Sequence, residues 1–211
     1  MALMNVNPTR MELTRLKKRL KTAVRGHKLL KDKRDEMMRR FVQLIRENAK
    51  LREAVEKELS RALGEFALCR GFMEPEALEQ AVMYPARTIS LEVGRRNIMS
   101  VDVPKIDAQA GEPVLSYGFA QTSAQLDGAI ARLAEIMPEM IRLAEIEKTC
   151  NMLADEIEKT RRRVNALEYV MIPDLEETIR YITMKLDENE RGSLTRLMKV
   201  KDMIAERDQA G

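Results

Sequence analysis

Histidine and cysteine, two side chains often used in catalysis and metal binding, are scarce in this chain of 211 residues. It has one histidine, His27, and two cysteines, Cys69 and Cys150, which lie far apart in the sequence. A single imidazole has no partner for metal binding or for a catalytic triad, so we expect His27 to be a packed structural residue. We expect both thiols to be small buried side chains, with a regulatory disulfide as the alternative.

An acidic cluster, Asp187, Glu188 and Glu190, could offer carboxylates to a metal ion. On a single helix, however, such side chains are expected to form a solvated or ion-paired face. The chain has no phosphate-cradling glycine-rich loop, no CxxC pair and no nucleophile elbow. We therefore expect no catalytic residue, no cofactor, no metal site and no enzymatic activity of this chain alone.

Positive charge is concentrated near the start of the chain. Residues 10–52 contain 16 Lys and Arg against 5 Asp and Glu, although the net charge of the whole chain is only +3. Arg161, Arg162 and Arg163 are consecutive, and on a helix at least one of them must point outward. Ordinary solvation and contact with an acidic protein surface both remain open. Nucleic-acid binding is disfavoured, because no aromatic residues are interleaved with the basic ones.

Two long helices must position these residues. The first is predicted to begin near Pro8 or Arg10, where Thr9 and Glu12 have the spacing of a capping box. Its apolar stripe is Leu13, Leu16, Leu20, Ala23, His27, Leu30, Arg34, Met37, Phe41, Leu44, Asn48, Leu51 and Val55. The register is expected to slip around Leu59, after which Leu63 and Phe66 continue the stripe to Cys69. Such a helix would be roughly 80–90 Å long.

The second helix is predicted to resume near Ser123 or Gln125 and to reach the C-terminal region. Its stripe includes Ile157, Thr160, Val164, Leu167, Met171, Leu175, Thr178, Ile179, Ile182 and Leu186. The spacing of three and four residues is typical of a seam between helices, and an additional step of four after Met171 is a stutter. Pro173 lies at this stutter, which predicts a kink or local unwinding.

Antiparallel pairing of the two helices is the simplest arrangement, with both chain ends at the same tip. Leu13 would then lie opposite about Met203, and Phe66 opposite about Cys150, so that both cysteines lie near the base of the pair. Acidic residues between Asp174 and Glu190 would neutralise part of the basic first helix across the seam.

Glycine and proline concentrate in the middle third of the chain. A short helix is predicted between Met73 and Met83. Two runs of alternating apolar residues follow, at 89–93 and 99–103, and the connection Gly94-Arg95-Arg96-Asn97 predicts a β-hairpin whose second strand ends at Pro104. A two-stranded ribbon is marginal alone, so it should pack on the long helices or on a partner.

The predicted fold is therefore mainly α, a long antiparallel two-helix coiled coil with a small helix and a β-hairpin in its middle segment. The segments are a long N-terminal helix at residues 1–69, a middle segment at 70–122 and a long C-terminal helix at 123–211. The composition agrees, with 34% charged and 4% aromatic residues. No apolar run is long enough to span a membrane, so we expect a soluble cytoplasmic protein.

Three blocks of sequence carry a resemblance to a known family. Residues 7–10 (NPTR), 26–34 (GHKLLKDKR) and 159–168 (KTRRRVNALE), followed by Ile172-Pro173, resemble the D subunit of V-type and archaeal A-type rotary ATPases. The blocks are long, contiguous and in the same order as in that family. Residues 70–125 carry no block that can be matched residue by residue.

The resemblance implies a central-stalk rotor protein without catalytic activity. In that family the coiled coil is a shaft whose tip enters a hexamer of catalytic A and non-catalytic B subunits. The F subunit binds the shaft, and the base docks on the subunit that caps the membrane ring. The protein would then be peripheral to the membrane and bind no nucleic acid. Candidate partner contacts are Arg10, Lys28, Lys31, Arg34, Arg161, Arg162, Arg163 and Glu168.

Other functions remain open. The γ-type shaft of F-type ATP synthases also has two terminal helices, but the middle segment here is too short for the α/β domain between them. A cytoplasmic coiled-coil adaptor or scaffold without a motor role would explain the heptads and not the three blocks. A basic rod that binds nucleic acid is a third alternative, and its affinity for nucleic acid would fall steeply as the salt concentration rises. The coupling ion, and whether hydrolysis or synthesis dominates, depend largely on other subunits.

Overall fold

The computed structural model describes residues 6–83, 89–111, 116–118 and 122–209. Helix α1 (Arg10–Phe72) is followed by α2 (Pro75–Met83), strands β1 (Ile89–Ile98) and β2 (Val101–Ala110), and a long helical run. That run consists of α3 (Ala124–Ala166), the π-helix η1 (Leu167–Met171) and α4 (Ile172–Gln209). The predicted fold class, mainly helical with a small helix and a hairpin between two long helices, is confirmed.

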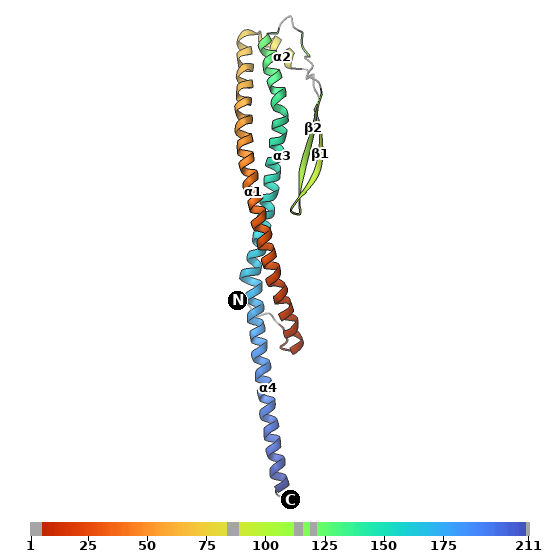
Figure 1. The fold of residues 1–211 in the computed structure, drawn as a ribbon, viewed down its shortest axis with the longest axis vertical. Helices are drawn as coiled ribbons and strands as arrows, with labels where there is room; N and C mark the ends of the chain where they lie inside the picture. The colour runs from red at the N-terminus through yellow and green to blue at the C-terminus, as the bar shows by residue number, and fades with distance from the viewer. Residues whose placement is uncertain (1–5, 84–88, 112–115, 119–121, 210–211) are drawn as a thin grey trace. The chain divides into compact units, whose positions relative to one another are not determined.

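The described chain divides into two compact units. The first unit contains residues 1–35 and 158–211, and the second contains residues 36–157. Within each unit, part of α1 packs antiparallel against part of the second helical run (Figure 1). Helix α1 begins as predicted, since the backbone N–H of Glu12 donates to Thr9 Oγ1 at 3.2 Å and caps the first turn.

The first unit is held together by a seam of aliphatic side chains. Leu16, Ala23, Leu175 and Ile182 form its buried cluster, and partly buried leucines and isoleucines pack around them. Met171, which was predicted to lie in this seam, is instead 40% exposed. The reason is the π-helix, because the wider turn between Leu167 and Met171 inserts one residue and brings Ile172 into the seam instead.

The π-helix also explains how Pro173 is tolerated inside a continuous helical run. The backbone N–H of Ile172 bonds to the carbonyl of Leu167, five residues earlier, rather than four. Pro173 has no N–H to donate, and a regular α-turn would press its ring against the preceding carbonyls. The local unwinding predicted at Pro173 is therefore confirmed, in the form of a π-turn that ends just before it.

The register predicted for the two long helices was wrong. Arg10, the first residue of α1, forms an ion pair with Glu190, and Leu13 packs in the cluster that contains Leu186. Met203 is 60% exposed and takes no part in that cluster. Helix α4 therefore extends past the start of α1, so the two helices do not end at the same level.

The second unit shows the same shift in register. An ion pair between Arg132 and Glu65 at 2.9 Å places Phe66 beside Ile130 rather than Cys150. The stripe along α1 also continues without the predicted slip, because Ala62 is buried and Leu63 is 53% exposed. Ala62 follows Val55 by a heptad, so the seven-residue spacing is kept.

The β-hairpin packs on the helices of its own unit, as predicted. Val101 and Val103 of β2 are buried in a cluster with Leu153, and Phe41 and Leu44 of α1 pack against this cluster. In Figure 1 the hairpin lies alongside α3. Short helix α2 is likewise close to its predicted position, with Leu78 and Ala81 buried against Cys69 and Leu126.

The turn of the hairpin, however, is not where the sequence indicated. Strands β1 and β2 join through Met99 and Ser100, both of which have positive φ (53° and 69°), and Ile98 pairs with Val101. Positive φ at both central residues is the type I′ conformation of two-residue hairpins. Residues Gly94 to Asn97 continue β1 as an exposed strand, so the loss of apolar alternation there reflects solvent exposure rather than a turn.

Pro104 was predicted to end the second strand, and it does not. It pairs with Arg95 in the middle of the hairpin, and β2 continues to Ala110. Proline is tolerated on an edge strand where its nitrogen faces away from the neighbouring strand. The parts of the middle segment at 84–88, 112–115 and 119–121 lie outside the described residues.

Candidate partner-binding surfaces

Lys28 and Lys31 are exposed on the basic first helix. Neither lysine has an ion pair within the part of the chain that the structure describes. Charged side chains that remain solvated in this way are free to meet an acidic partner, because no intramolecular contact has to be broken first. Among the predicted contact residues of α1, these two lysines are the most accessible to a partner.

The three consecutive arginines of α3 are all exposed, which confirms that at least one points outward. Arg162 forms an ion pair with Glu158, one turn earlier on the same helix. Arg161 and Arg163 have no ion pair among the described residues. We call Lys28, Lys31, Arg161 and Arg163 the open basic group.

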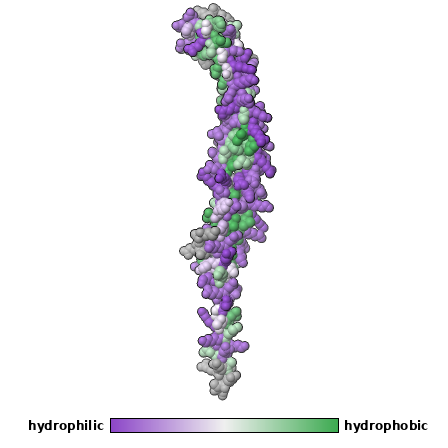
Figure 2. Space-filling model, turned by 90° about the vertical axis from the view of Figure 1, so that its left-hand side faces the viewer, coloured by the Kyte–Doolittle hydropathy of each residue, from purple (hydrophilic) through white to green (hydrophobic). Residues whose placement is uncertain are grey.

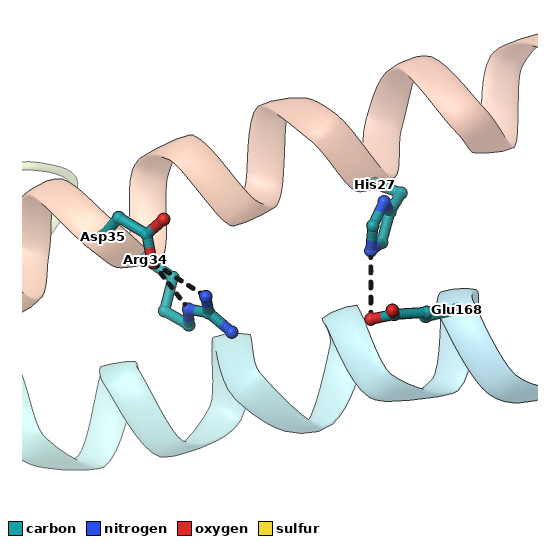
Figure 3. A network of polar contacts seen from close by, with 4 residues as sticks. All are labelled: His27, Arg34, Asp35 and Glu168. Atoms are coloured by element: carbon teal, nitrogen blue, oxygen red, sulfur yellow. Dashed lines mark hydrogen bonds and ion pairs between the residues drawn. The ribbon is translucent and has the colours of Figure 1, made fainter.

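A contact across the seam places two members of this group, Lys31 and Arg163, at one level of the first unit. His27 Nε2 of α1 lies 3.4 Å from Glu168 Oε2 of η1, and the two side chains point toward each other (Figure 3). In an antiparallel pair, one turn forward along α1 corresponds to one turn backward along its partner. Lys31 and Arg163 therefore lie at nearly the same level, about one turn beyond the His27–Glu168 contact.

The remaining predicted contact residues are engaged within the chain. Arg34 donates from Nε and a terminal nitrogen to Asp35 Oδ1, at 3.0 and 2.8 Å, and its side chain is 28% exposed (Figure 3). Arg10 pairs with Glu190 between exposed side chains. Glu168 faces His27. The structure thus separates these residues from the open basic group.

Acidic side chains of α4 neutralise less of the basic face than predicted. Among the described residues of the first unit, Arg10–Glu190 is the ion pair that crosses between the helices, and His27 Nε2 lies 3.4 Å from Glu168 Oε2 without a hydrogen bond. Glu188 instead pairs with Lys185 on its own helix at 2.9 Å, and Lys185 lowers the pKa of this glutamate.

Exposed apolar side chains mark surfaces that the sequence stripes did not reveal. Tyr169 and Val170 of the π-helix are 70% and 57% exposed, next to Met171. Every residue from Ser193 to Ala205 of α4 is exposed, including these apolar ones: Leu194, Leu197, Met198, Val200, Met203 and Ile204. Figure 2 shows hydrophobic patches between hydrophilic side chains along one face. Large exposed apolar groups of this kind are typical of interaction surfaces.

A third apolar surface lies where α1 meets α2. Phe72 and Met83 are 73% and 66% exposed, and Val82 is 51% exposed. Beside them, a shallow groove is lined by these residues: Phe66, Arg70, Pro75, Leu78, Glu79, Val82 and Met83. Burial of these apolar side chains against another protein would be favourable, so this end of the second unit is a candidate docking surface.

The described residues contain no group of three or more histidine, cysteine or acidic side chains that could hold a metal ion. Within the same part of the chain, no helix is long and apolar enough to cross a membrane.

Cys69 and Cys150 are both buried free thiols, as predicted. They do not lie at one level, because Cys69 packs against Leu126 whereas Cys150 is near Glu47 of α1. Cys69 and Glu47 are separated along α1 by about 33 Å, far beyond the reach of a disulfide.

The comparisons with known proteins agree on one family. The family model of the ATP synthase D subunit matches residues 12–202. The chain is 59% identical over 210 residues to the V-type ATP synthase D subunit of Clostridium botulinum strain Langeland, covering 97% of each protein. It is 60% identical to that of Acetivibrio thermocellus, covering 98% of this chain and 95% of the relative. Identity to the Clostridium novyi protein is 57% over the full length of both. The chain with these paired helices and exposed basic side chains therefore belongs to the D-subunit family of V-type ATP synthases.

Proposed function

We propose that this chain is the central-stalk rotor component of a V-type ATP synthase. It would transmit torque between the hexamer of A and B subunits, where ATP is hydrolysed or synthesised, and the membrane ring that translocates protons or sodium ions. The chain itself would have no catalytic role. It would be peripheral to the membrane on the cytoplasmic side.

The observation that carries this proposal is the seam between α1 and the second helical run. Buried clusters of aliphatic side chains occur along both units, including one with Leu16 and Leu175 and one with Val55 and Ile136. Close-packed side chains resist the sliding of one helix past the other, because any shift opens voids or forces overlaps. A helix pair of this kind is suited to carrying a twisting load.

The surfaces described above fit the partners that such a rotor requires. The apolar extension of α4 beyond Glu190 is suited to entering the A/B hexamer, where its side chains would be buried. The open basic group would meet acidic surfaces of the surrounding subunits. The apolar surface at Phe72 and Met83 would dock on the subunit that caps the membrane ring. The F subunit would bind elsewhere along the paired helices.

Reconstitution with purified A, B and F subunits tests this function. The chain should co-purify with the hexamer, and the complex that contains it should show ATPase activity coupled to rotation of a bead fixed to this chain. If the chain neither joins the hexamer nor changes its turnover, the rotor proposal is wrong and an adaptor role becomes the better explanation.

Charge reversal tests the open basic group within that assay. The double variant Arg161→Glu and Arg163→Glu should weaken retention in the complex by roughly tenfold, because it places repulsion where attraction is proposed. The matched control is Lys57→Glu with Lys148→Glu, which makes the same change in net charge at two exposed lysines of the second unit. Equal loss in both double variants would point to net charge rather than to this surface.

A further inference from the structure

Strand β1 is exposed to a degree that is unusual for a strand of ten residues. Every residue from Ile89 to Asn97 is exposed, and only Ile98, beside the turn, is partly buried. Natural proteins normally shorten, charge or cover such an edge, because its unpaired N–H and C=O groups can pair with another chain. The two outer edges of this hairpin differ in how they are protected.

The outer edge of β2 is protected. The backbone N–H of Ile106 donates to Glu145 Oε2 of α3 at 3.1 Å, so this edge lies against a helix. Pro104 removes a second donor from the strand. Val101 and Val103 are buried against the helices. These features make β2 unsuitable for pairing with a further strand.

No helix or proline of the described residues protects the outer edge of β1, and the register identifies the backbone groups that point outward there. Ile98 and Val101 flank a two-residue turn, which makes them a hydrogen-bonded pair. Val93 and Ile106 must then be a non-hydrogen-bonded pair, in agreement with the Ile106 N–H donating to Glu145 instead. The odd-numbered residues of β1 therefore direct their N–H and C=O groups away from β2.

The same odd-numbered residues place apolar side chains on one exposed face. Ile89, Leu91 and Val93 are 36%, 53% and 68% exposed. The next residue of this face is Arg95, which has no ion pair within the described ranges. The edge thus combines unpaired backbone groups, three apolar side chains and one free cation in a single row.

We propose that β1 accepts an extended strand from another subunit of the ATP synthase complex. That strand would carry apolar side chains beside Leu91 and Val93 and a carboxylate beside Arg95. Backbone hydrogen bonds would supply affinity, and the alternating side chains would supply register and specificity. This inference rests on the proposed function, because it places the partner within the same complex.

Amide hydrogen exchange, resolved to single residues, tests the proposal on the intact chain. In the isolated chain, amides of Ser90, Glu92, Gly94 and Arg96 should be protected by β2, while those of Leu91, Val93, Arg95 and Asn97 exchange quickly. After assembly with purified A, B and F subunits and the ring-capping subunit, exchange at the odd-numbered set should slow by about tenfold or more.

A proline substitution separates the backbone contribution from that of the side chain. Leu91→Pro removes one outward N–H and leaves the hydrogen bonds to β2 in place, so it should weaken retention of the partner by roughly fivefold to tenfold. The matched control Leu91→Val keeps the N–H and an apolar side chain, and it should bind normally. Protection of the even-numbered amides in each variant shows that the hairpin is still folded.

Three outcomes would overturn the proposal. The chain could assemble while the odd-numbered amides still exchange quickly, which would leave the rotor function intact and show that this edge stays open. The Leu91→Pro variant could retain the partner as tightly as the Leu91→Val variant does. Protection of the odd-numbered amides in the isolated chain that is lost on dilution would show instead that a second copy of the chain occupies the edge. Failure of the chain to assemble at all would count against the proposed function first.

Discussion

His27 occupies a position in the helix seam where most coiled coils place an aliphatic side chain. Its side chain is 19% exposed, and its Nε2 atom is buried without a hydrogen bond, 3.4 Å from Glu168. A polar atom buried without a partner costs free energy relative to water. The imidazole therefore contributes to the seam by its volume more than by its polar contact.

Two substitutions of His27 should separate volume from polarity. His27→Leu fills the same space without a polar atom, so we expect the free energy of unfolding to be unchanged or about 1 kcal/mol higher. His27→Ala leaves a void and should cost about 1–2 kcal/mol. Urea unfolding followed by circular dichroism measures both. If Leu destabilises as much as Ala does, the contact with Glu168 is the stabilising element, and Glu168→Gln should then show the same loss.

Cys150 should make the stability of the protein depend on pH in the alkaline range. Burial raises the pKa of this thiol, and Glu147 and Glu47 raise it further. Above about pH 8.5 the unfolded chain releases the thiol proton while the folded chain retains it, so stability falls as pH rises. The slope from this group is at most about 1.4 kcal/mol per pH unit.

Denaturation at pH 7.5, 8.5 and 9.5 measures this slope. The variant Cys150→Ala, which lacks the titrating thiol, is the comparison. The variant is expected to be less stable at pH 7.5 through lost packing, but its stability should fall less between pH 8.5 and 9.5. Identical slopes in the two proteins would show that the Cys150 thiol does not couple to folding.

At the scale of elements, the π-helix joins two stretches of the seam that would otherwise be out of phase. Leu167 and Ile172 both contact the first-unit core although they are five positions apart. The stutter and Pro173 were visible in the sequence, and they predicted a local departure from the α-helix. The choice between a kink and a π-turn depends on how neighbouring carbonyls and side chains accommodate the ring, which the spacing of apolar residues does not encode.

Deleting one residue of the π-helix should be tolerated. Removal of Val170, combined with Pro173→Ala, would restore a four-residue step from Leu167 to the isoleucine and keep both stretches of the seam in phase. We expect a change in the free energy of unfolding within about 1 kcal/mol. The matched control deletes Glu158 from α3, which rotates the chain beyond it by about 100° and should cost several kcal/mol. Similar losses in both deletions would contradict this explanation.

The register of the helices can be tested by crosslinking. Arg10 meets Glu190, so Leu13, one turn later in α1, lies level with Leu186, one turn earlier in α4. In a background where both native cysteines are replaced by alanine, Leu13→Cys with Leu186→Cys should form an intramolecular disulfide under mild oxidation. Leu13→Cys with Met203→Cys should not. The opposite result on non-reducing gels would restore the register that the sequence first indicated.

The stripes of α1 illustrate what sequence patterns can and cannot predict here. Leu16, Ala23, Met37 and Val55 lie in the seam as the heptads predicted. Heptads repeat, however, so they admit several alignments of one helix on the other, and the apolar pattern alone did not select the observed one. The hairpin turn was missed for a related reason, because β1 is exposed and its apolar alternation stops at Val93, before the strand ends at Ile98.

The candidate contact residues also divide into those that the sequence could predict and those that it could not. Side-chain exposure at Arg161 and Arg163 follows from three arginines in succession on a helix, so it was predictable. The pairing of Arg10 with Glu190 depends on the register, and the sequence alone could not supply it. The apolar surface at Tyr169 and Val170 depends on the π-turn and was therefore missed as well.

At the scale of the whole molecule, the C-terminal part of α4 should be dispensable for folding and important for assembly. Within the described chain, the segment from Ser193 onward contributes no side chain to the buried clusters. Ending the chain after Gly192 should therefore change the free energy of unfolding by less than about 1 kcal/mol. It should also reduce ATPase activity of the reconstituted complex. Normal activity of the truncated chain would show that the hexamer does not require this segment.

Among the residues that the structure describes, no second helix lies beside α4 beyond Glu190, and this difference has a mechanical consequence. Where two helices are locked side by side, bending one requires the other to stretch or slide, whereas a lone helix bends through its own hydrogen bonds. The end of α4 is thus the compliant part of an otherwise stiff element. In the proposed rotor, this end would deflect first under load, store elastic energy and smooth the transmission of discrete rotational steps.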